Sequence, residues 1–208
     1  MKIALQQTIW FSPKASRRLR SLKQIFKELR SVHEDYVDGE RNNGDCPYWY
    51  GERPHTGLLA AAVWRQGGTA LEEYGTRKTK ELKSKSGRCD LYIRTKNTAF
   101  ECEAKRLWLN LGKKADVSCQ KVADRLNWAI RDVKHLQRRK GLALCFATPV
   151  IRESKLADLE TRLCEWIKLL KSSSGWDAMV WIRIAKGQKP LGRKFKHVGL
   201  LLAIREMR

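Results

Sequence analysis

Residues 87–108 read Gly-Arg-Cys-Asp-Leu-Tyr-Ile-Arg-Thr-Lys-Asn-Thr-Ala-Phe-Glu-Cys-Glu-Ala-Lys-Arg-Leu-Trp, and the pattern within them determines the predicted fold. Apolar and polar residues alternate in two stretches, which predicts strands over 87–95 and 98–108. Asp90 lies on the polar face of the first strand, opposite Cys89 and Leu91. Because side chains alternate along a strand, three polar residues share one face of the second: Glu101, Glu103 and Lys105.

These polar residues have the composition of a metal-dependent hydrolytic site. If the two strands pair as neighbours, Asp90 and Glu103 can meet across them. Two carboxylates at that distance repel each other unless a cation lies between them. Mg²⁺ accepts such oxygen ligands while keeping several waters, and Mn²⁺ should substitute for it. Lys105 could hold an attacking water beside the metal, so the set suits phosphodiester hydrolysis.

The segments on either side of residues 87–108 predict an α/β fold. A buried helix over about 55–66 and a strand over 69–80 come before the motif, and a helix over about 117–139 and an apolar strand over 142–151 come after it. This αβββαβ order indicates a mixed central sheet flanked by helices. Further elements are predicted on both sides: a helix over 13–36 with Ser12 as cap and Pro13 first, a helix over 154–171, and strands in 176–185 and 196–206.

The Gly-Arg-Cys-Asp and Glu-Cys-Glu-Ala-Lys segments, in this order of elements, resemble the signature of the PD-(D/E)xK, or restriction-endonuclease-like, nuclease superfamily. The resemblance covers about residues 52–150. It implies that Asp90 is the motif aspartate, Glu103 the second acid and Lys105 the lysine. Cys89 stands where the signature has proline.

The same resemblance implies an activity and further ligands. We expect a Mg²⁺-dependent deoxyribonuclease, an endonuclease in preference to an exonuclease, with Asp90 and Glu103 as metal ligands. Some members take a third acid from the helix before the first strand, and Glu52 is the best match here, with Glu72 or Glu73 behind it. Glu101 points the right way to be a ligand as well.

The charge of the chain also favours a polyanionic partner. The 208 residues contain 43 lysines and arginines against 22 acidic residues, a formal net charge of +21. Nucleic acid is the commonest partner of such a chain, and the resemblance favours DNA. The residues expected to contact it form three groups: Arg77, Lys78, Lys83, Lys85 and Arg88; Arg138 and Arg139; Lys189, Arg193 and Lys194.

Other interpretations remain open. An isolated Glu-x-Glu-x-Lys pattern is by default a solvated, salt-bridged strand face, and the basic groups by default serve solubility. The main alternative is therefore a non-catalytic nucleic-acid-binding module with a degenerate site. A membrane-surface or scaffolding factor would explain the charge but not the placement of the acids. We expect no membrane association, because no apolar run approaches the roughly 18 residues of a spanning helix.

The sequence also predicts how the chain is divided into parts and in which cellular compartment it lies. No long linker interrupts the chain, which predicts one nuclease-like domain over 1–208, with an N-terminal helical extension (1–51), the core (52–150) and a C-terminal sheet extension (151–208). The six cysteines form no Cys-x-x-Cys pair, and no signal segment is evident, which favours free thiols in a reducing, cytoplasmic compartment. A homodimer would fit the resemblance, since one site cuts one strand.

Overall fold

The structure is a computed structural model that describes residues 7–38, 47, 50–80, 83–136, 140–183 and 195–207. Its elements, in chain order, are β1 (Gln7–Phe11), α1 (Arg17–Ser21), α2 (Lys23–Asp38), α3 (Glu52–Arg65), β2 (Thr69–Lys80), β3 (Lys83–Arg94), β4 (Ala99–Asn110), α4 (Ala115–Val133), β5 (Gly141–Arg152), the 3₁₀ helix η3 (Glu153–Asp158), α5 (Leu159–Ser172), β6 (Ala178–Ile182), β7 (Phe195–His197) and β8 (Leu200–Glu206). The predicted order from α3 to β5 is present.

The described strands form a single mixed sheet. Their order is β1-β6-β8-β5-β4-β3-β2, and β7 pairs separately with β5. Within the described residues, β4 and β5 form the one parallel pair, and every other pairing is antiparallel. The predicted α/β class with a mixed, helix-flanked sheet is therefore confirmed.

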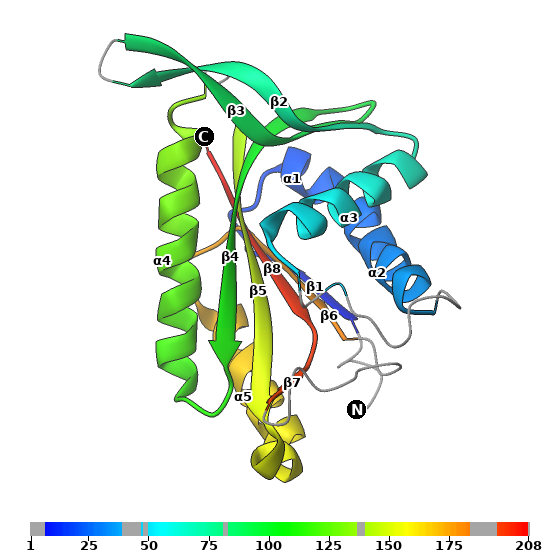
Figure 1. Cartoon of the computed structure of the whole chain (residues 1–208), viewed down its shortest axis with the longest axis vertical. Helices are drawn as coiled ribbons and strands as arrows, with labels where there is room; N and C mark the ends of the chain where they lie inside the picture. Colours follow the sequence, from blue (N-terminus) through cyan, green and yellow to red (C-terminus); the bar gives the residue numbers. More distant parts are fainter. Residues whose placement is uncertain are drawn as a thin grey trace.

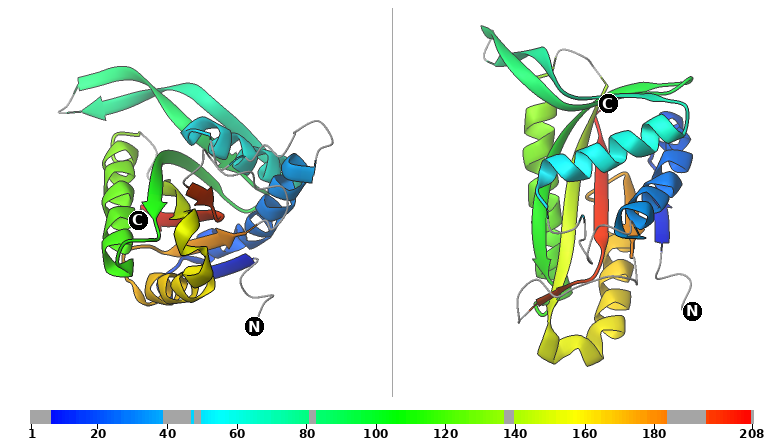
Figure 2. Two further views of the ribbon diagram at one scale, coloured as in Figure 1. Left: turned by 60° about the horizontal axis from the view of Figure 1, so that its bottom comes forward. Right: turned by 45° about the vertical axis from the view of Figure 1, so that its right-hand side comes forward.

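Helices cover both faces of this sheet, as Figures 1 and 2 show. On one face, α1, α2 and α3 pack over apolar residues such as Leu91, Phe100 and Leu144. On the other, α4 and α5 pack over Ala143, Cys145 and their neighbours. Residues 141–151 of β5 are buried throughout, as expected for an apolar strand that is covered on both sides.

The N-terminal extension differs from the prediction of one helix over 13–36. Residues 7–11 form β1, which pairs with β6, and the Ser12 N–H continues this pairing by donating to the Asp177 carbonyl oxygen at 2.8 Å. The helix begins later, because Ser16 is the residue whose side chain accepts the Leu19 N–H, at 3.0 Å. Between residues 7 and 38 the extension is thus a strand followed by two helices rather than purely helical.

The described residues of the C-terminal extension contain three strands where two were predicted. The segment over 196–206 divides at Gly199 into β7, which pairs with the end of β5, and β8, which pairs with β5 and β6. A side chain at Gly199 would collide with the Ile182 carbonyl oxygen and the Trp181 ring. This close approach explains why glycine occupies the bend.

The structure also shows the state of the cysteines and the character of the helices. Five cysteines are free in the structure: Cys89, Cys102, Cys119, Cys145 and Cys164. The sixth, Cys46, lies outside the described residues. No helix in the described part of the chain combines the length and the apolar character needed to cross a membrane.

Candidate active site

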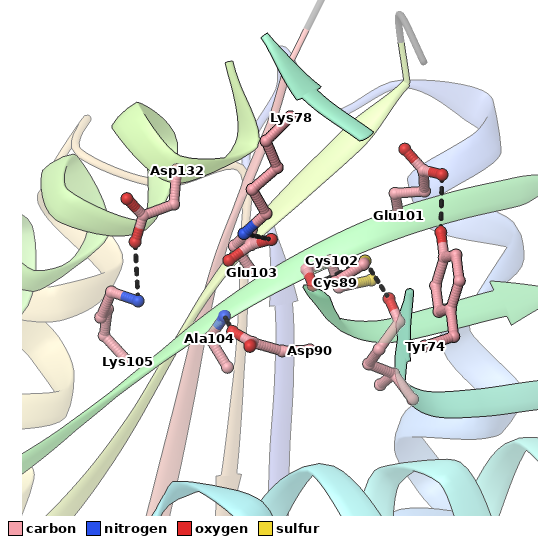
Figure 3. Close-up of polar contacts among 11 residues, drawn as sticks. Tyr74, Lys78, Cys89, Asp90, Glu101, Cys102, Glu103, Ala104, Lys105 and Asp132 are labelled. Carbon is pink, nitrogen blue, oxygen red and sulfur yellow. Dashed lines mark hydrogen bonds and ion pairs between the residues drawn. The ribbon is translucent and has the colours of Figure 1, made fainter. Parts of the chain in front are cut away.

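Strands β3 and β4 carry Asp90 and Glu103 at the end of their shared ladder. The antiparallel pairing runs from Arg94↔Ala99 to Leu91↔Cys102, and Asp90 and Glu103 are the next residue along each strand. There the regular ladder ends, and the Asp90 Oδ2 atom accepts the Ala104 N–H at 2.8 Å (Figure 3). The neighbouring strands predicted from the sequence are present, and this hydrogen bond holds the Asp90 carboxylate at the surface of β4.

Glu103 is a buried carboxylate with a lysine partner. It is 2% exposed, and Lys78 Nζ lies 2.7 Å from its Oε1 atom. The pKa of Glu103 is raised to about 7: burial raises it most, the hydrogen bond from Lys78 lowers it and the charge of Asp90 raises it. Glu103 therefore holds its proton more tightly than an exposed glutamate does.

Lys105 is on the same strand but pairs with a different element. Its Nζ atom lies 2.8 Å from Oδ2 of Asp132, near the end of α4 (Figure 3). Burial lowers the pKa of Lys105, but the hydrogen bond and charge of Asp132 outweigh it, so the pKa lies above its usual value. Lys105 is therefore a charged hydrogen-bond donor at neutral pH, rather than a base.

Glu52 lies close enough to influence the group. It is the first residue of α3 and is half-buried. Burial raises the pKa of Glu52, the charge of Lys105 lowers it, and the charge of Asp90 raises it again. The third acid expected from the resemblance therefore lies within electrostatic range of both Asp90 and Lys105.

The Glu101 carboxylate accepts a hydrogen bond from β2. It is buried, and the Tyr74 hydroxyl donates to its Oε1 atom at 2.6 Å. Burial and this hydrogen bond raise the pKa of Tyr74. Figure 3 shows Glu101 directed at Tyr74 of β2, away from the pair formed by Lys78 and Glu103. Glu101 therefore lies outside the Asp90–Glu103 pair.

The other two acids considered are also outside it. Glu73 forms ion pairs with Arg53, at 2.6 Å, and with Arg88, at 2.9 Å. Glu72 lies beside Gly57 of α3. Neither is placed to share a metal ion with Asp90 and Glu103.

Three side chains that contact the predicted site residues in the structure were not expected there: Asp132, Tyr74 and Lys78. Asp132 and Tyr74 were not among the predicted site residues, and Lys78 was predicted only to bind nucleic acid. For Asp132 a signal existed: it precedes Val133, which is on the buried stripe of α4, so its side chain borders the sheet. For Lys78 and Tyr74 no signal existed, because their direction depends on the local twist of β2.

The donor set is compatible with a Mg²⁺ ion. Among the described residues no cluster of three or more histidine, cysteine, aspartate or glutamate side chains could hold a metal. Mg²⁺, however, commonly uses only one or two carboxylates and completes its shell with water and substrate phosphate oxygens. Asp90 and Glu103 supply two hard oxygen donors, and the ammonium group of Lys78 already neutralises one of them.

The predicted nucleic-acid contacts are only partly described. Lys78 turns to Glu103, and Arg88 pairs with Glu73 while its side chain remains 62% exposed. Arg77, Lys83 and Lys85 belong to the paired backbones of β2 and β3. Five of the predicted contacts lie outside the described residues: Arg138, Arg139, Lys189, Arg193 and Lys194.

No family model, curated protein or solved structure matches this chain.

Proposed function

We propose that this chain is a metal-dependent nuclease that hydrolyses phosphodiester bonds in DNA, with a restriction-endonuclease-like core. One observation carries the proposal. Strands β3 and β4 pair as neighbours up to Leu91↔Cys102, Asp90 and Glu103 are the next residue along each strand, and Lys105 follows Glu103 by two residues. The α3-to-β5 order around these residues and the net charge of +21 support the same conclusion.

Each side chain has a distinct role in the proposed reaction. Asp90 and Glu103 would hold the Mg²⁺ ion, which supplies Lewis acidity at the scissile phosphate when bound. The Ala104 N–H fixes one oxygen of Asp90 and leaves the other for the ion. Lys105 remains protonated, so it can hold the attacking water or stabilise charge that develops on the phosphate oxygens. Asp132 positions Lys105 through their 2.8 Å ion pair.

The test is cleavage of supercoiled and linear DNA in Mg²⁺, Mn²⁺ or EDTA. We expect Asp90→Asn and Lys105→Met to reduce the cleavage rate by at least about a hundredfold, the usual cost of removing one group that stabilises a transition state. Asp158→Asn is the matched control, because Asp158 is exposed in η3 and pairs only loosely with Arg162, at 3.6 Å. Full activity in both site variants would refute the proposal.

The alternative is a nucleic-acid-binding module without catalysis. The observation in its favour is that Glu103 and Asp132 each have a lysine partner, as in purely structural ion pairs. Thermal unfolding with added Mn²⁺ separates the two functions, because a ligand that binds only the folded state raises the Tm. The nuclease proposal requires a rise in Tm that Asp90→Asn abolishes, whereas the binding module requires none.

A further inference from the structure

Strands β2 and β3 continue beyond the sheet as a two-stranded ribbon. β3 pairs with β4 only between Leu91 and Arg94, whereas β2 and β3 remain paired as far as Lys80↔Lys83. Residues 75–80 and 83–88 therefore form a ribbon with no third strand among the described residues, which we call the arm. Figures 1 and 2 show the arm projecting from the body of the molecule, at the end where α4 finishes.

The arm is strongly basic and is poorly stabilised by its own sequence. Residues 75–88 contain six basic residues, against the single acid Glu81 and the single leucine Leu82. The register sets Lys80 opposite Lys83, and it sets Lys85 opposite Lys78, whose own charge is paired with Glu103. Like charges at opposite positions destabilise a strand pair, and an isolated two-stranded hairpin is marginal in water. These features are consistent with a partner that supplies dense negative charge.

We propose that the arm inserts into the major groove of B-form DNA. The inference rests on the proposed function for its choice of nucleic acid as partner. The major groove of B-DNA is about 12 Å wide and admits a two-stranded β-ribbon. The major groove of A-form RNA is deep and narrow, and side chains cannot read it. The shape of the arm therefore specifies duplex DNA rather than duplex RNA.

The base of the arm is continuous with the candidate site. Lys78 belongs to the arm, and its ammonium group reaches Glu103. The Lys78 backbone also bridges to Leu136, just after α4. A duplex held on the arm would consequently place its phosphate backbone next to Asp90 and Glu103, so binding in the groove and cleavage would be coupled in space.

The experiment measures binding without cleavage. In EDTA, fluorescence anisotropy compares a DNA duplex, an RNA duplex of the same sequence and the single DNA strand, over a range of salt concentrations. The arm variant carries Lys80→Gln, Lys83→Gln and Lys85→Gln. The matched control loses three lysines at the opposite end of the molecule, through Lys155→Gln, Lys168→Gln and Lys171→Gln, all at exposed positions of η3 and α5.

We expect the wild-type chain to bind the DNA duplex at least about tenfold more tightly than the RNA duplex. The arm variant should lose roughly tenfold or more in affinity for DNA at 100 mM salt, and its salt slope should fall by up to about 0.9 for each phosphate contact removed. The control should retain both the preference for DNA and most of the affinity. A second variant, in which Asn-Gly replaces residues 79–84, should show the same loss if the arm variant misfolds.

Equal binding of the DNA and RNA duplexes by the wild-type chain would overturn the inference, as would equal losses in the arm variant and the control. Either result would mean that affinity follows bulk charge. Because cleavage plays no part in these measurements, a failure of the arm is distinguishable from a failure of the nuclease proposal. The latter would appear as unchanged cleavage by Asp90→Asn.

Discussion

Two lysines approach the candidate site, and their partners differ in a way that separates their functions. Lys105 pairs with Asp132, which is not a proposed metal ligand, so Lys105 can keep its partner when an ion binds. Lys78 pairs with Glu103, which is a proposed ligand. Its ammonium group therefore occupies a position next to the carboxylate that a divalent ion would need.

Removal of Lys78 should consequently strengthen metal binding. We expect Lys78→Met to bind Mn²⁺ about tenfold more tightly than the wild-type chain in titration calorimetry, because a competing positive charge is lost. The titration should be done at about pH 8.5. Loss of Lys78 also removes the hydrogen bond and the charge that lower the pKa of Glu103, and a high pH keeps this carboxylate ionised. Arg88→Met, which removes an equal charge that pairs with Glu73, should leave the affinity unchanged. Weaker Mn²⁺ binding in Lys78→Met would contradict this role.

The raised pKa of Glu103 predicts how stability depends on pH. Between the ordinary value of 4.5 and about 7, the folded chain binds a proton that the unfolded chain has released. This contribution to stability is complete below pH 4.5 and is lost as the pH rises through about 7. In EDTA, Glu103→Gln should thus gain stability relative to the wild-type chain as the pH rises, by up to about 3 kcal/mol.

Urea denaturation of both proteins at pH 4.5, 6 and 8 measures this difference. Glu160→Gln serves as the control, because Glu160 is exposed on α5 and its surface ion pair with Arg183 should contribute little to stability. If the free energies of unfolding of the wild type and of Glu103→Gln change with pH in parallel, burial does not raise the pKa of Glu103.

Asp132 should control the pH range over which Lys105 works. Its hydrogen bond and charge raise the pKa of Lys105, so Asp132→Asn should lower that pKa. If protonated Lys105 is required, the alkaline limb of the pH–rate profile for DNA cleavage moves to lower pH in this variant. A uniform loss of rate at every pH would instead indicate that Asp132 acts only on the packing of α4.

At the scale of the element, one residue of β2 determines which side chains reach the site. Glu72 lies beside Gly57, and Glu73 pairs with Arg53, so two successive side chains of β2 turn towards α3. In a regular strand they would alternate. Glu73 has φ of 47°, an uncommon value for a residue with a side chain, and it is left out of the pairing between Glu72↔Leu91 and Tyr74↔Cys89. Tyr74 and Lys78 then face Glu101 and Glu103.

Gly87 of β3 provides the space through which Lys78 reaches Glu103. A Cβ atom at Gly87 would lie 2.9 Å from the Cγ and Cδ atoms of Lys78. Gly87→Val should displace this side chain and increase the affinity for Mn²⁺, as Lys78→Met does. Gly75→Val is the control on the partner strand, because nothing lies within 4 Å of a Cβ atom there. Equal Mn²⁺ affinities for the two valine variants would show that Gly87 has no such role.

At the scale of the whole molecule, the sheet joins the two ends of the chain to the core. β5 pairs with β4 of the core on one edge and with β8 on the other, and β8 is followed by β6 and then β1. In the core segment 52–152 taken alone, β5 is the most buried strand, and the edge that β8 covers would therefore have no partner. The N-terminal and C-terminal extensions belong to the same hydrophobic clusters as the core.

This topology predicts that the chain unfolds as one cooperative unit. We expect a fragment of residues 52–152 to lack a folded structure by circular dichroism and by NMR, because β5 would expose one edge and the apolar surface that α1, α2 and α5 help to cover. The full chain should show coincident unfolding curves by circular dichroism and tryptophan fluorescence. A fragment with dispersed NMR signals would show that the extensions are dispensable.

Alternating side chains and apolar periodicity were sufficient to predict the α3-to-β5 order, the strands β3 and β4, and the acids and lysine that these strands present, because those patterns are local. The apolar run of β5 also predicted a strand covered on both faces. Pairing between segments far apart in the sequence decided the rest. Gln7–Phe11 is a strand because it pairs with the edge of β6. Glycine occupies the bend at 199 because the chain passes close to Ile182 there. The partners of Lys78, Lys105 and Glu101 depend on how β2 lies beside β4 and on the docking of α4. Such partners lie 25 to 27 residues apart in sequence and carry no periodic signal, so only the packed chain brings them together.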